Sequence, residues 1–252
     1  MTKTVLITGA TSGFGRAIAV KFGENDYKLI ITGRRRDRLN HLSRELREKH
    51  HAEVLQLCFD VRKVNEVEAA IQTLPEEWKA IDILINNSGL AAGMSLIHEG
   101  LIDDWERMID TNVKGLLYMT RFIAPMMVER KQGHIINIGS IAGKEVYPGG
   151  NVYCASKFAV DAITKGARID LVAHNIKVTQ IAPGSAETEF ALVRFHGDAE
   201  KAAGVYKGYI PLRPEDIAEV VYYCATLPAH VNINDMVITC TAQASSMHFN
   251  RK

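Results

Sequence analysis

Hydrophobic positions follow two alternating patterns along the chain. Short runs are apolar at successive positions, which is typical of strands buried on both faces of a parallel sheet. These runs predict strands at residues 4–8, 28–32, 53–58, 81–86, 134–138 and 177–181. Between them apolar residues recur at helical spacing, which predicts helices at residues 13–25, 36–50, 63–73, 103–130 and 152–173.

This repeating order predicts the fold class. Alternating strands and helices indicate an α/β fold in which a doubly wound parallel sheet carries helices on both faces, as in Rossmann-type domains. No Pro-, Gly- or Ser-rich linker divides the chain, so we expect residues 1–252 to form a single domain. Residues 183–208 mix glycine, charged and aromatic residues, and we expect this segment to be a loop that covers the substrate as a lid.

Composition narrows the classes of function. With 47% hydrophobic and 23% charged residues, the chain has the make-up of a globular protein and not of a disordered one. The formal net charge of +1 gives no general attraction to nucleic acid or acidic lipid, so we expect neither partner. Every apolar run is shorter than the roughly 20 residues of a membrane span. Residues 1–3 lead directly into the first strand without a signal-peptide pattern, and we therefore expect a cytoplasmic protein.

The cysteines do not suggest a metal centre. They are widely separated along the chain, at Cys58, Cys154, Cys224 and Cys240. Metal-binding cysteines usually come in closely spaced pairs, and this chain has none. We expect reduced thiols in the core or near the site, and no bound metal.

A glycine-rich turn follows the first strand. The three glycines of residues 8–15 would let backbone amides approach a pyrophosphate at the positive end of the next helix. Their spacing is not G-x-G-x-x-G, so a plain glycine turn is the alternative interpretation. The candidate cofactor residues here are Gly9, Thr11, Ser12, Gly13, Phe14 and Gly15.

Two arginines follow the second strand. At this point an NAD-binding fold normally offers an acidic side chain to the ribose. The chain has Arg34 and Arg35 instead, and their guanidinium groups suit a ribose 2′-phosphate. NADP is therefore favoured over NAD. We expect Arg36 and Arg38 to belong to a solvated helix start.

Polar residues also follow the third and fourth strands, where this architecture places ligands. Asp60 and Val61 come after the third strand, and Asp60 is a candidate acceptor for the adenine amino group. Asn86 and Asn87 come at the end of the fourth strand. We take Asn87 as a cofactor candidate, whereas for Asn86 a buried amide that holds the loop is an equally good explanation.

Proton-transfer chemistry is suggested by Tyr153 and Lys157. A spacing of four places both side chains on one face of a helix. An ammonium beside a phenol, together with the positive charge of a nicotinamide, would bring the tyrosine pKa closer to working pH. Ser140 offers a hydroxyl to the same substrate oxygen, and Asn112 could orient a water joined to Lys157.

Taken together, these motifs resemble the short-chain dehydrogenase/reductase family over almost the whole chain. Its T-G-x-x-x-G-x-G, N-N-A-G, Y-x-x-x-K and P-G patterns are matched, except that Ser88 replaces the alanine. The resemblance implies an NADP-dependent oxidoreductase and a homotetramer. It implies that the catalytic residues are Asn112, Ser140, Tyr153 and Lys157. It further implies that Lys157 holds the nicotinamide ribose, and that Pro183, Gly184 and Thr188 line the nicotinamide.

A finer resemblance is to the bacterial NADP-dependent 3-hydroxy acid dehydrogenases, which act on L-serine, L-allo-threonine and malonic semialdehyde. It is carried by residues 76–84, 149–153, 193–198 and 227–234. Such a substrate has a carboxylate that needs a cation, and we take Arg194 as the candidate, with a surface arginine as the alternative. Cys154 and residues 185–187 depart from the pattern we expect in this group, so substrate choice is the open point.

Two other functions are compatible with these residues. One is a reductase of another carbonyl, such as a 3-oxoacyl chain or a cyclic ketone, because the four catalytic candidates read only the reacting oxygen. The other is a nucleotide-sensing regulator that keeps the fold without the chemistry. The presence of all four candidates favours an enzyme.

Overall fold

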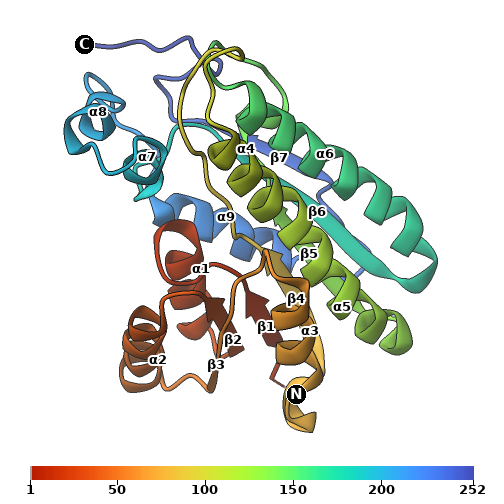
Figure 1. The fold of residues 1–252 in the computed structure, drawn as a ribbon. Helices are drawn as coiled ribbons and strands as arrows, with labels where there is room; N and C mark the ends of the chain where they lie inside the picture. Colours follow the sequence, from red (N-terminus) through yellow and green to blue (C-terminus); the bar gives the residue numbers. More distant parts are fainter. Residues whose placement is uncertain (1) are drawn as a thin grey trace.

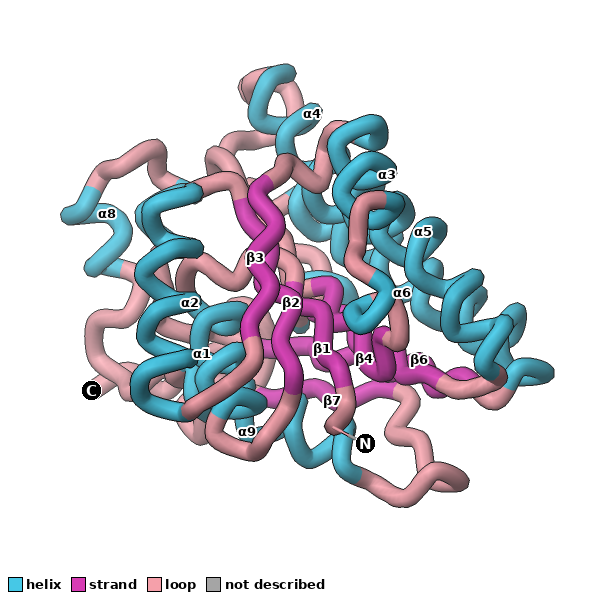
Figure 2. The backbone as a smooth tube through the Cα atoms, turned by 90° about the horizontal axis from the view of Figure 1, so that it is seen from below, coloured by secondary structure: helices cyan, strands magenta, loops and turns pink. Residues whose placement is uncertain are grey.

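Seven parallel strands form one sheet in the order β3-β2-β1-β4-β5-β6-β7 in the computed structural model, which describes residues 2–252. The strands are β1 (Thr4–Ile7), β2 (Lys28–Gly33), β3 (Val54–Cys58), β4 (Ile81–Asn86), β5 (Gly133–Ile138), β6 (Ile176–Pro183) and β7 (Asp235–Ile238). Chain order reverses at β1, so β1 lies between β2 and β4 (Figure 2). The predicted doubly wound fold is confirmed, and the reversal creates the crevice at which such sheets bind ligands.

Helices cover both faces of the sheet (Figure 1). One face carries α1 (Gly13–Gly23), α2 (Arg36–His50) and α9 (Pro214–Thr226), and the other carries α3 (Val64–Gln72), α5 (Gly115–Arg130) and α6 (Asn151–Leu171). Successive residues of β1 serve the two faces in turn. Val5 and Ile7 pack in the cluster of α1, α2 and α9, whereas Leu6 packs in that of α3 and α5. This explains why the strand is apolar at every position from Val5 to Ile7.

Strand β7 and helix α9 were not predicted from the sequence. Strand β7 is a four-residue edge strand whose positions alternate between exposed and half-buried, so it lacks the continuous apolar run of the central strands. Helix α9 begins at Pro214, and the Asp216 carboxylate accepts a hydrogen bond from the Arg213 amide at 2.7 Å. Both are recognisable start signals. They add a seventh strand and a covering helix to the same sheet.

The predicted helix at residues 103–130 contains an irregular turn. Helix α4 (Ile102–Ile109) and α5 are joined by a π-helical turn at Asp110–Lys114, so the three form one continuous helical rod. A π turn holds one residue more than an α turn, and such turns are frequent at functional sites. Thr111 and Asn112 are buried within it.

The 183–208 segment is not a plain loop, because it contains two short helices, α7 (Phe190–Arg194) and α8 (Ala199–Gly204). The end of the chain packs against it: the Lys252 amide donates to the carbonyl of Gly208 at 2.8 Å. In Figure 1 these helices project beyond the sheet, on the side where the chain ends.

The cysteines lie in the core or near the site, as expected. Cys154, Cys224 and Cys240 are buried thiols. Cys58 is exposed at the end of the edge strand β3 and lies beside the cavity, with its Sγ 3.7 Å from the carbonyl of the lining residue Arg34. Within residues 2–252, none of the helices combines the length and the apolar character that crossing a membrane requires.

Candidate active site

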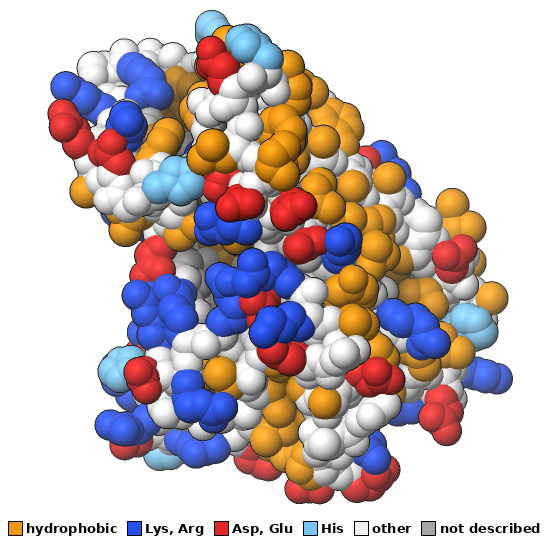
Figure 3. Space-filling model, in the orientation of Figure 1, with side chains coloured by type: hydrophobic (Ala, Val, Ile, Leu, Met, Phe, Trp, Pro, Cys, Tyr) orange, Lys and Arg blue, Asp and Glu red, His pale blue; other side chains and the backbone are white. Residues whose placement is uncertain are grey.

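A cavity of about 750 Å³ opens at the carboxyl ends of the strands. Its walls come from the 8–15 loop, the ends of β2 to β6, the 183–208 segment and the last residues of the chain. Lys and Arg side chains gather beneath the lobe of α7 and α8 (Figure 3). Most of the predicted site residues line this cavity, but Gly15, Asn112 and Lys157 lie behind its wall.

The glycine loop needs glycine for steric reasons. Gly9 and Gly13 have positive φ angles of 67° and 50°, a region that favours glycine. A Cβ on Gly15 would lie 2.4 Å from the carbonyl oxygen of Gly9 and 2.4 Å from Nδ2 of Asn87. Asn87 in turn donates to the carbonyl of Thr8 at 2.8 Å, so it holds the loop as well as lining the cavity. The loop therefore presents bare backbone at the start of α1, as a pyrophosphate site requires.

Arginines from the end of β2 and the start of α2 form a charged cluster at one end of the cavity. Arg35 donates to Thr11 Oγ1 at 2.9 Å and to Ser12 Oγ at 2.8 Å. It also pairs with Glu189 at 3.0 Å. Arg38, which we expected to be merely solvated, pairs with the same carboxylate at 2.6 Å. The sequence offered no signal for Glu189, because it lies about 150 positions further along the chain.

Asp60 is already paired on the protein side. Arg62 donates to its carboxylate at 2.6 Å, and Arg34 lies 3.7 Å from it. Burial acts to raise the pKa of Asp60, but the hydrogen bonds and charge of Arg62 hold it below its usual value. Asp60 and Val61 both line the cavity, so an adenine amino group would share the carboxylate with Arg62.

Asn86, the last residue of β4, is a buried amide with a structural role. Its amide donates to Thr120 Oγ1 at 3.1 Å and to Asn137 Oδ1 at 2.9 Å, below the cavity floor. It is buried and does not line the cavity.

Asn112 is fixed by three hydrogen bonds. Its carbonyl accepts from the Leu90 amide at 2.8 Å, and its amide donates to the Leu90 carbonyl at 2.8 Å and to Ser156 Oγ at 2.9 Å. The π turn brings this side chain to Gly89. A Cβ on Gly89 would lie 3.3 Å from Asn112 Oδ1 and 3.5 Å from Lys157 Nζ, so only glycine leaves both polar groups uncovered here.

Lys157 is a buried lysine on α6. Its ammonium donates to the carbonyl of Ile138 at 2.9 Å. Burial lowers the pKa of Lys157 to about 8. At neutral pH the group is still mostly charged, because the pH lies below that value. The structure thus keeps a positive charge inside the protein, one helical turn from Tyr153.

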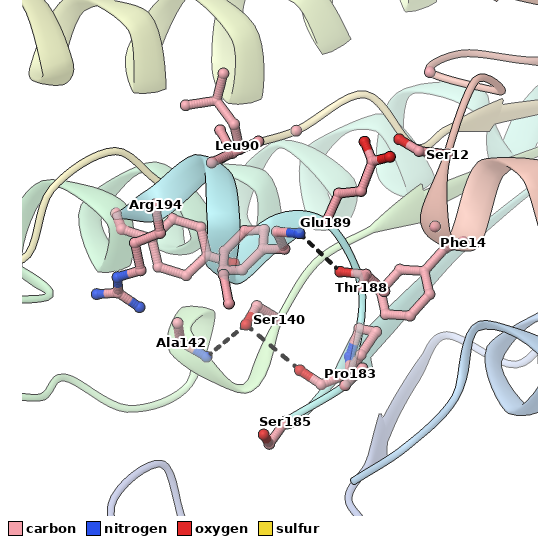
Figure 4. A pocket seen from close by; sticks show the side chains of 18 of the residues that line it. Ser12, Phe14, Leu90, Ser140, Ala142, Pro183, Ser185, Thr188, Glu189 and Arg194 are labelled. Atoms are coloured by element: carbon pink, nitrogen blue, oxygen red, sulfur yellow. Dashed lines mark hydrogen bonds between the residues drawn. The ribbon is translucent and has the colours of Figure 1, made fainter. Parts of the chain in front are cut away.

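Tyr153 lies on the same helix and faces the cavity. Burial raises its pKa and Tyr147 adds to the rise, while the Ser140 hydroxyl and the charge of Arg194 oppose it. Ser140 Oγ accepts from the Ala142 amide at 3.1 Å and donates to the Pro183 carbonyl at 3.4 Å (Figure 4). In the protein alone the Tyr153 hydroxyl is therefore protonated at neutral pH.

Arg194 reaches the tyrosine from α7. Its Nη1 donates to the Tyr147 hydroxyl at 2.9 Å, and its Cζ lies 5.7 Å from the centre of the Tyr153 ring. Nε and Nη2 are buried and have no hydrogen-bond partner among residues 2–252. Buried donors without partners are costly, so this is not the surface arginine that was the alternative. Tyr147 was missed, since no spacing motif links it to Arg194.

The end of β6 completes the wall. Gly184 cannot carry a side chain, because a Cβ would lie 2.2 Å from Gln243 Oε1, which accepts from the Ser185 amide. Thr188 Oγ1 accepts from the Phe190 amide at 3.1 Å, and the Phe190 ring packs against Tyr153 with 5.5 Å between ring centres. Phe190 and Gln243 were not among the predicted residues.

A parallel sheet with a bare glycine loop, an arginine cluster and a buried tyrosine–lysine pair defines the class of Rossmann-type oxidoreductases. Residues 3–197 match the family model of the short chain dehydrogenases. The chain belongs to the short-chain dehydrogenase family, which confirms the resemblance found in the sequence.

Individual relatives match over nearly their full length. The chain is 50% identical to the NADP-dependent 3-hydroxy acid dehydrogenase YdfG of Salmonella typhi over 248 residues, 97% of this chain and 98% of the relative. It is 46% identical to sulfoacetaldehyde reductase 2 of Chromohalobacter salexigens over 247 residues, 98% of this chain and 97% of the relative. Among solved structures, the closed form of serine dehydrogenase complexed with NADP⁺ superposes with a TM-score of 0.92 and 47% identity, covering 99% of this chain and 100% of that one.

Proposed function

We propose that this enzyme moves a hydride between NADP(H) and a small 3-hydroxy acid or its 3-oxo form. The observation that carries the proposal is Arg194, whose two unpartnered N–H groups are buried beside Tyr153. The relatives named for 3-hydroxy acids and serine support it, and the serine dehydrogenase structure, a complex with NADP⁺, supports the choice of cofactor.

The cavity fits the cofactor. The bare loop at Gly9, Gly13 and Gly15 leaves room for a pyrophosphate at the start of α1, and a side chain on any of the three would be strained or would clash. Arg34 and Arg35, with the hydroxyls of Thr11 and Ser12, would hold the ribose 2′-phosphate. Further contacts would come from Phe14, Asp60, Val61, Asn87, Tyr153, Lys157, Pro183, Gly184 and Thr188.

Tyr153 is the proposed acid and base. The nicotinamide accepts or supplies the hydride when bound. In reduction the Tyr153 hydroxyl gives its proton to the substrate oxygen, and in oxidation the phenolate takes that proton back. Because burial raises the pKa of Tyr153, the phenolate needs positive charge nearby. Arg194 already opposes the rise, and we propose that the Lys157 ammonium, one helical turn away on α6, adds further positive charge. Ser140 positions the same oxygen by a hydrogen bond.

Asn112 supports this pair from behind the cavity wall. Its amide is fixed between Leu90 and Ser156, with Oδ1 directed to the space beside Gly89 where Lys157 Nζ also lies. A water there could join the two groups and return a proton to Lys157 and Tyr153. This is the role we propose for Asn112.

Arg194 is the proposed partner of the substrate carboxylate. A planar guanidinium offers parallel donors to a carboxylate, and two of its N–H groups are unused. Since Arg194 lies over the Tyr153 ring, the acid group would sit only a few bonds from the reacting carbon. This favours a hydroxy acid over a cyclic ketone or a long 3-oxoacyl chain.

Among residues 2–252, the wall near Arg194 and Tyr153 has no acidic side chain to pair with a substrate ammonium. Within residues 2–252 the acidic side chains that line the cavity are Asp60 and Glu189, and both are paired with arginines at the other end. An unpaired buried ammonium is costly. Acids without an amino group, such as 3-hydroxypropionate, should therefore be better substrates than L-serine or L-allo-threonine.

Residues 1–252 would form a single domain, and residues 183–208 would act as its lid, because α7 brings Arg194 to the site. A homotetramer is supported by large apolar side chains exposed on the outer faces of α5 and α6, namely Leu117, Phe158 and Ile169. We propose that the enzyme is cytoplasmic.

The proposal is tested by steady-state kinetics on the purified protein. With NADP, kcat/KM should be highest for 3-hydroxypropionate, lower for L-serine, and lowest for 1-propanol and cyclohexanol. Isethionate has a sulfonate in place of the carboxylate of 3-hydroxypropionate, so its kcat/KM tests whether the Arg194 guanidinium also binds a sulfonate. Preference for cyclohexanol or a 3-hydroxyacyl thioester would assign the enzyme to another carbonyl class, and absence of turnover with every alcohol would favour a nucleotide-sensing regulator.

A further inference from the structure

The Glu189 carboxylate occupies the arginine cluster. One oxygen lies 3.0 Å from Arg35 and the other 2.6 Å from Arg38. Through the same guanidinium, Arg35 also donates to the hydroxyls of Thr11 and Ser12. In Figure 4 Glu189 extends towards Ser12, away from Ser140 and Arg194. Both arginines thus donate to one protein anion, while the two hydroxyls accept from the other side of the Arg35 guanidinium.

The Arg35 and Arg38 guanidinium groups that hold Glu189, together with the two hydroxyls beside Arg35, are groups that a phosphate would use. Guanidinium groups and hydroxyls bind phosphate oxygens by charge-assisted hydrogen bonds. A doubly charged phosphate placed on Arg35 would lie next to the Glu189 carboxylate, and like charges at that distance repel. Glu189 and the phosphate therefore compete for the same donors.

Glu189 also connects this cluster with the reacting end. It directly precedes α7, and its carbonyl accepts from the Val193 amide at 3.0 Å. The same helix carries Phe190 against the Tyr153 ring and Arg194 over it. A change of partner at Glu189 therefore acts on the helix that forms the substrate wall.

We propose that Glu189 is a built-in competitor of the ribose 2′-phosphate, displaced when NADP binds, and that its displacement frees the start of α7. The inference rests on the proposed use of NADP. All three side chains are 42–48% exposed, so their ion pairs are weak and the phosphate can replace them. NAD has no 2′-phosphate and leaves the ion pairs in place. The start of α7 is therefore held by Glu189 in the NAD complex and released in the NADP complex.

Equilibrium binding of NADP and NAD to wild type and Glu189→Gln tests the competition. The variant should bind NADP roughly 3- to 10-fold more tightly and NAD with unchanged affinity. Glu187→Gln is the matched control, because this substitution removes the same charge from the same segment. Glu187 is exposed and forms no ion pair within residues 2–252. Raising the salt concentration should shrink the difference between wild type and Glu189→Gln.

Hydrogen exchange of residues 190–197 tests the connection to α7. Adenosine 2′,5′-bisphosphate carries the 2′-phosphate without the nicotinamide, and it should speed exchange of the α7 amides in wild type. In Glu189→Gln the α7 amides should exchange faster even without ligand, so adenosine 2′,5′-bisphosphate should change their exchange rates little. 5′-AMP, which has no 2′-phosphate, should leave the exchange rates of both proteins unchanged.

The outcomes separate this inference from the proposed function. A wild type that binds NADP no better than NAD would overturn the cofactor assignment itself. A wild type that prefers NADP, with Glu189→Gln binding it equally or more weakly, would overturn the competition alone. Equal gains in Glu187→Gln and Glu189→Gln would reduce the effect to general charge, and α7 exchange that ignores adenosine 2′,5′-bisphosphate in wild type would remove the link to the substrate wall.

Discussion

The guanidinium of Arg194 lies over the Tyr153 ring, with 5.7 Å between Cζ and the ring centre. The two residues come from separate elements, α7 and α6, and meet at the wall of the cavity. Proton transfer and recognition of the acid group are therefore proposed to take place side by side. A substrate anion bound at Arg194 also reduces the positive charge next to Tyr153, so binding and proton affinity are linked.

Tyr153→Phe should lower kcat by about 10² to 10⁴, the usual cost of removing a general acid or base. NADP binding should persist, because the glycine loop and the arginine cluster are untouched. Turnover and NADP titration measure the two effects separately. Tyr223→Phe is the control, since that tyrosine is exposed on α9. Near-normal turnover in Tyr153→Phe would refute the proposed acid and base.

Replacing Arg34 and Arg35 by alanine should weaken NADP much more than NAD. The loss should be about 10-fold or more, because hydrogen bonds to charged groups contribute about 1.5–3 kcal/mol. Binding titrations with both cofactors measure it. Arg36→Ala, at an exposed neighbouring position, should leave both affinities unchanged. Equal losses of affinity for the two cofactors would show that Arg34 and Arg35 do not bind the ribose 2′-phosphate.

Arg194→Lys should raise KM for 3-hydroxypropionate by about 10-fold, since lysine keeps the charge but loses the planar pair of donors. KM for 1-propanol should change little. Tyr147→Phe removes the hydroxyl that orients the guanidinium and should cause a smaller rise for the acid. If every substrate changes by the same factor, another residue binds the carboxylate.

Acid should destabilise the protein through His134. This side chain is buried beside Thr179, and burial, followed by the charges of Lys177 and Lys3, lowers its pKa to about 3. An unfolded histidine titrates near 6.5. Between these values only the unfolded state binds the proton, so stability falls as the pH drops, by about 2 kcal/mol from pH 7 to pH 5.

Urea unfolding at pH 7 and pH 5 measures this effect at constant protein concentration. His134→Gln should lose most of the difference, whereas His230→Gln, at an exposed position, should keep it. An unchanged pH dependence in His134→Gln would assign the acid sensitivity to other groups.

Much of the site followed from local pattern. Tyr153 and Lys157 could be paired because helical spacing alone determines which side chains share a face. The helix at 36–50 was predicted with the observed bounds, since its amphipathic pattern is long and regular. Ser140 and Asn112 were suggested by their side-chain chemistry, and the family resemblance then implied that they are catalytic, because no local spacing specifies their positions.

What escaped prediction depends on contacts between distant segments. Glu189 meets Arg35 and Arg38 only because the segment between β6 and α7 passes beside the end of β2 and the start of α2. Tyr147 acquires its role from Arg194, 47 positions away. Whether Asp60 is free or paired likewise depends on the rotamer of Arg62, which composition and periodicity do not encode.

The π turn between α4 and α5 holds one residue more than a regular α-helix would need at this point. Deleting one residue from Asp110–Lys114 would restore a regular α-helix and leave α4 and α5 in almost the same relative orientation, because five π-helical residues and four α-helical residues each turn the chain by about 400°. The stripe of Met119, Ile123 and Met127 would therefore stay against the sheet, whereas Asn112 would lose the widened backbone that directs its side chain to Leu90. The shortened rod would keep its core and lose its site.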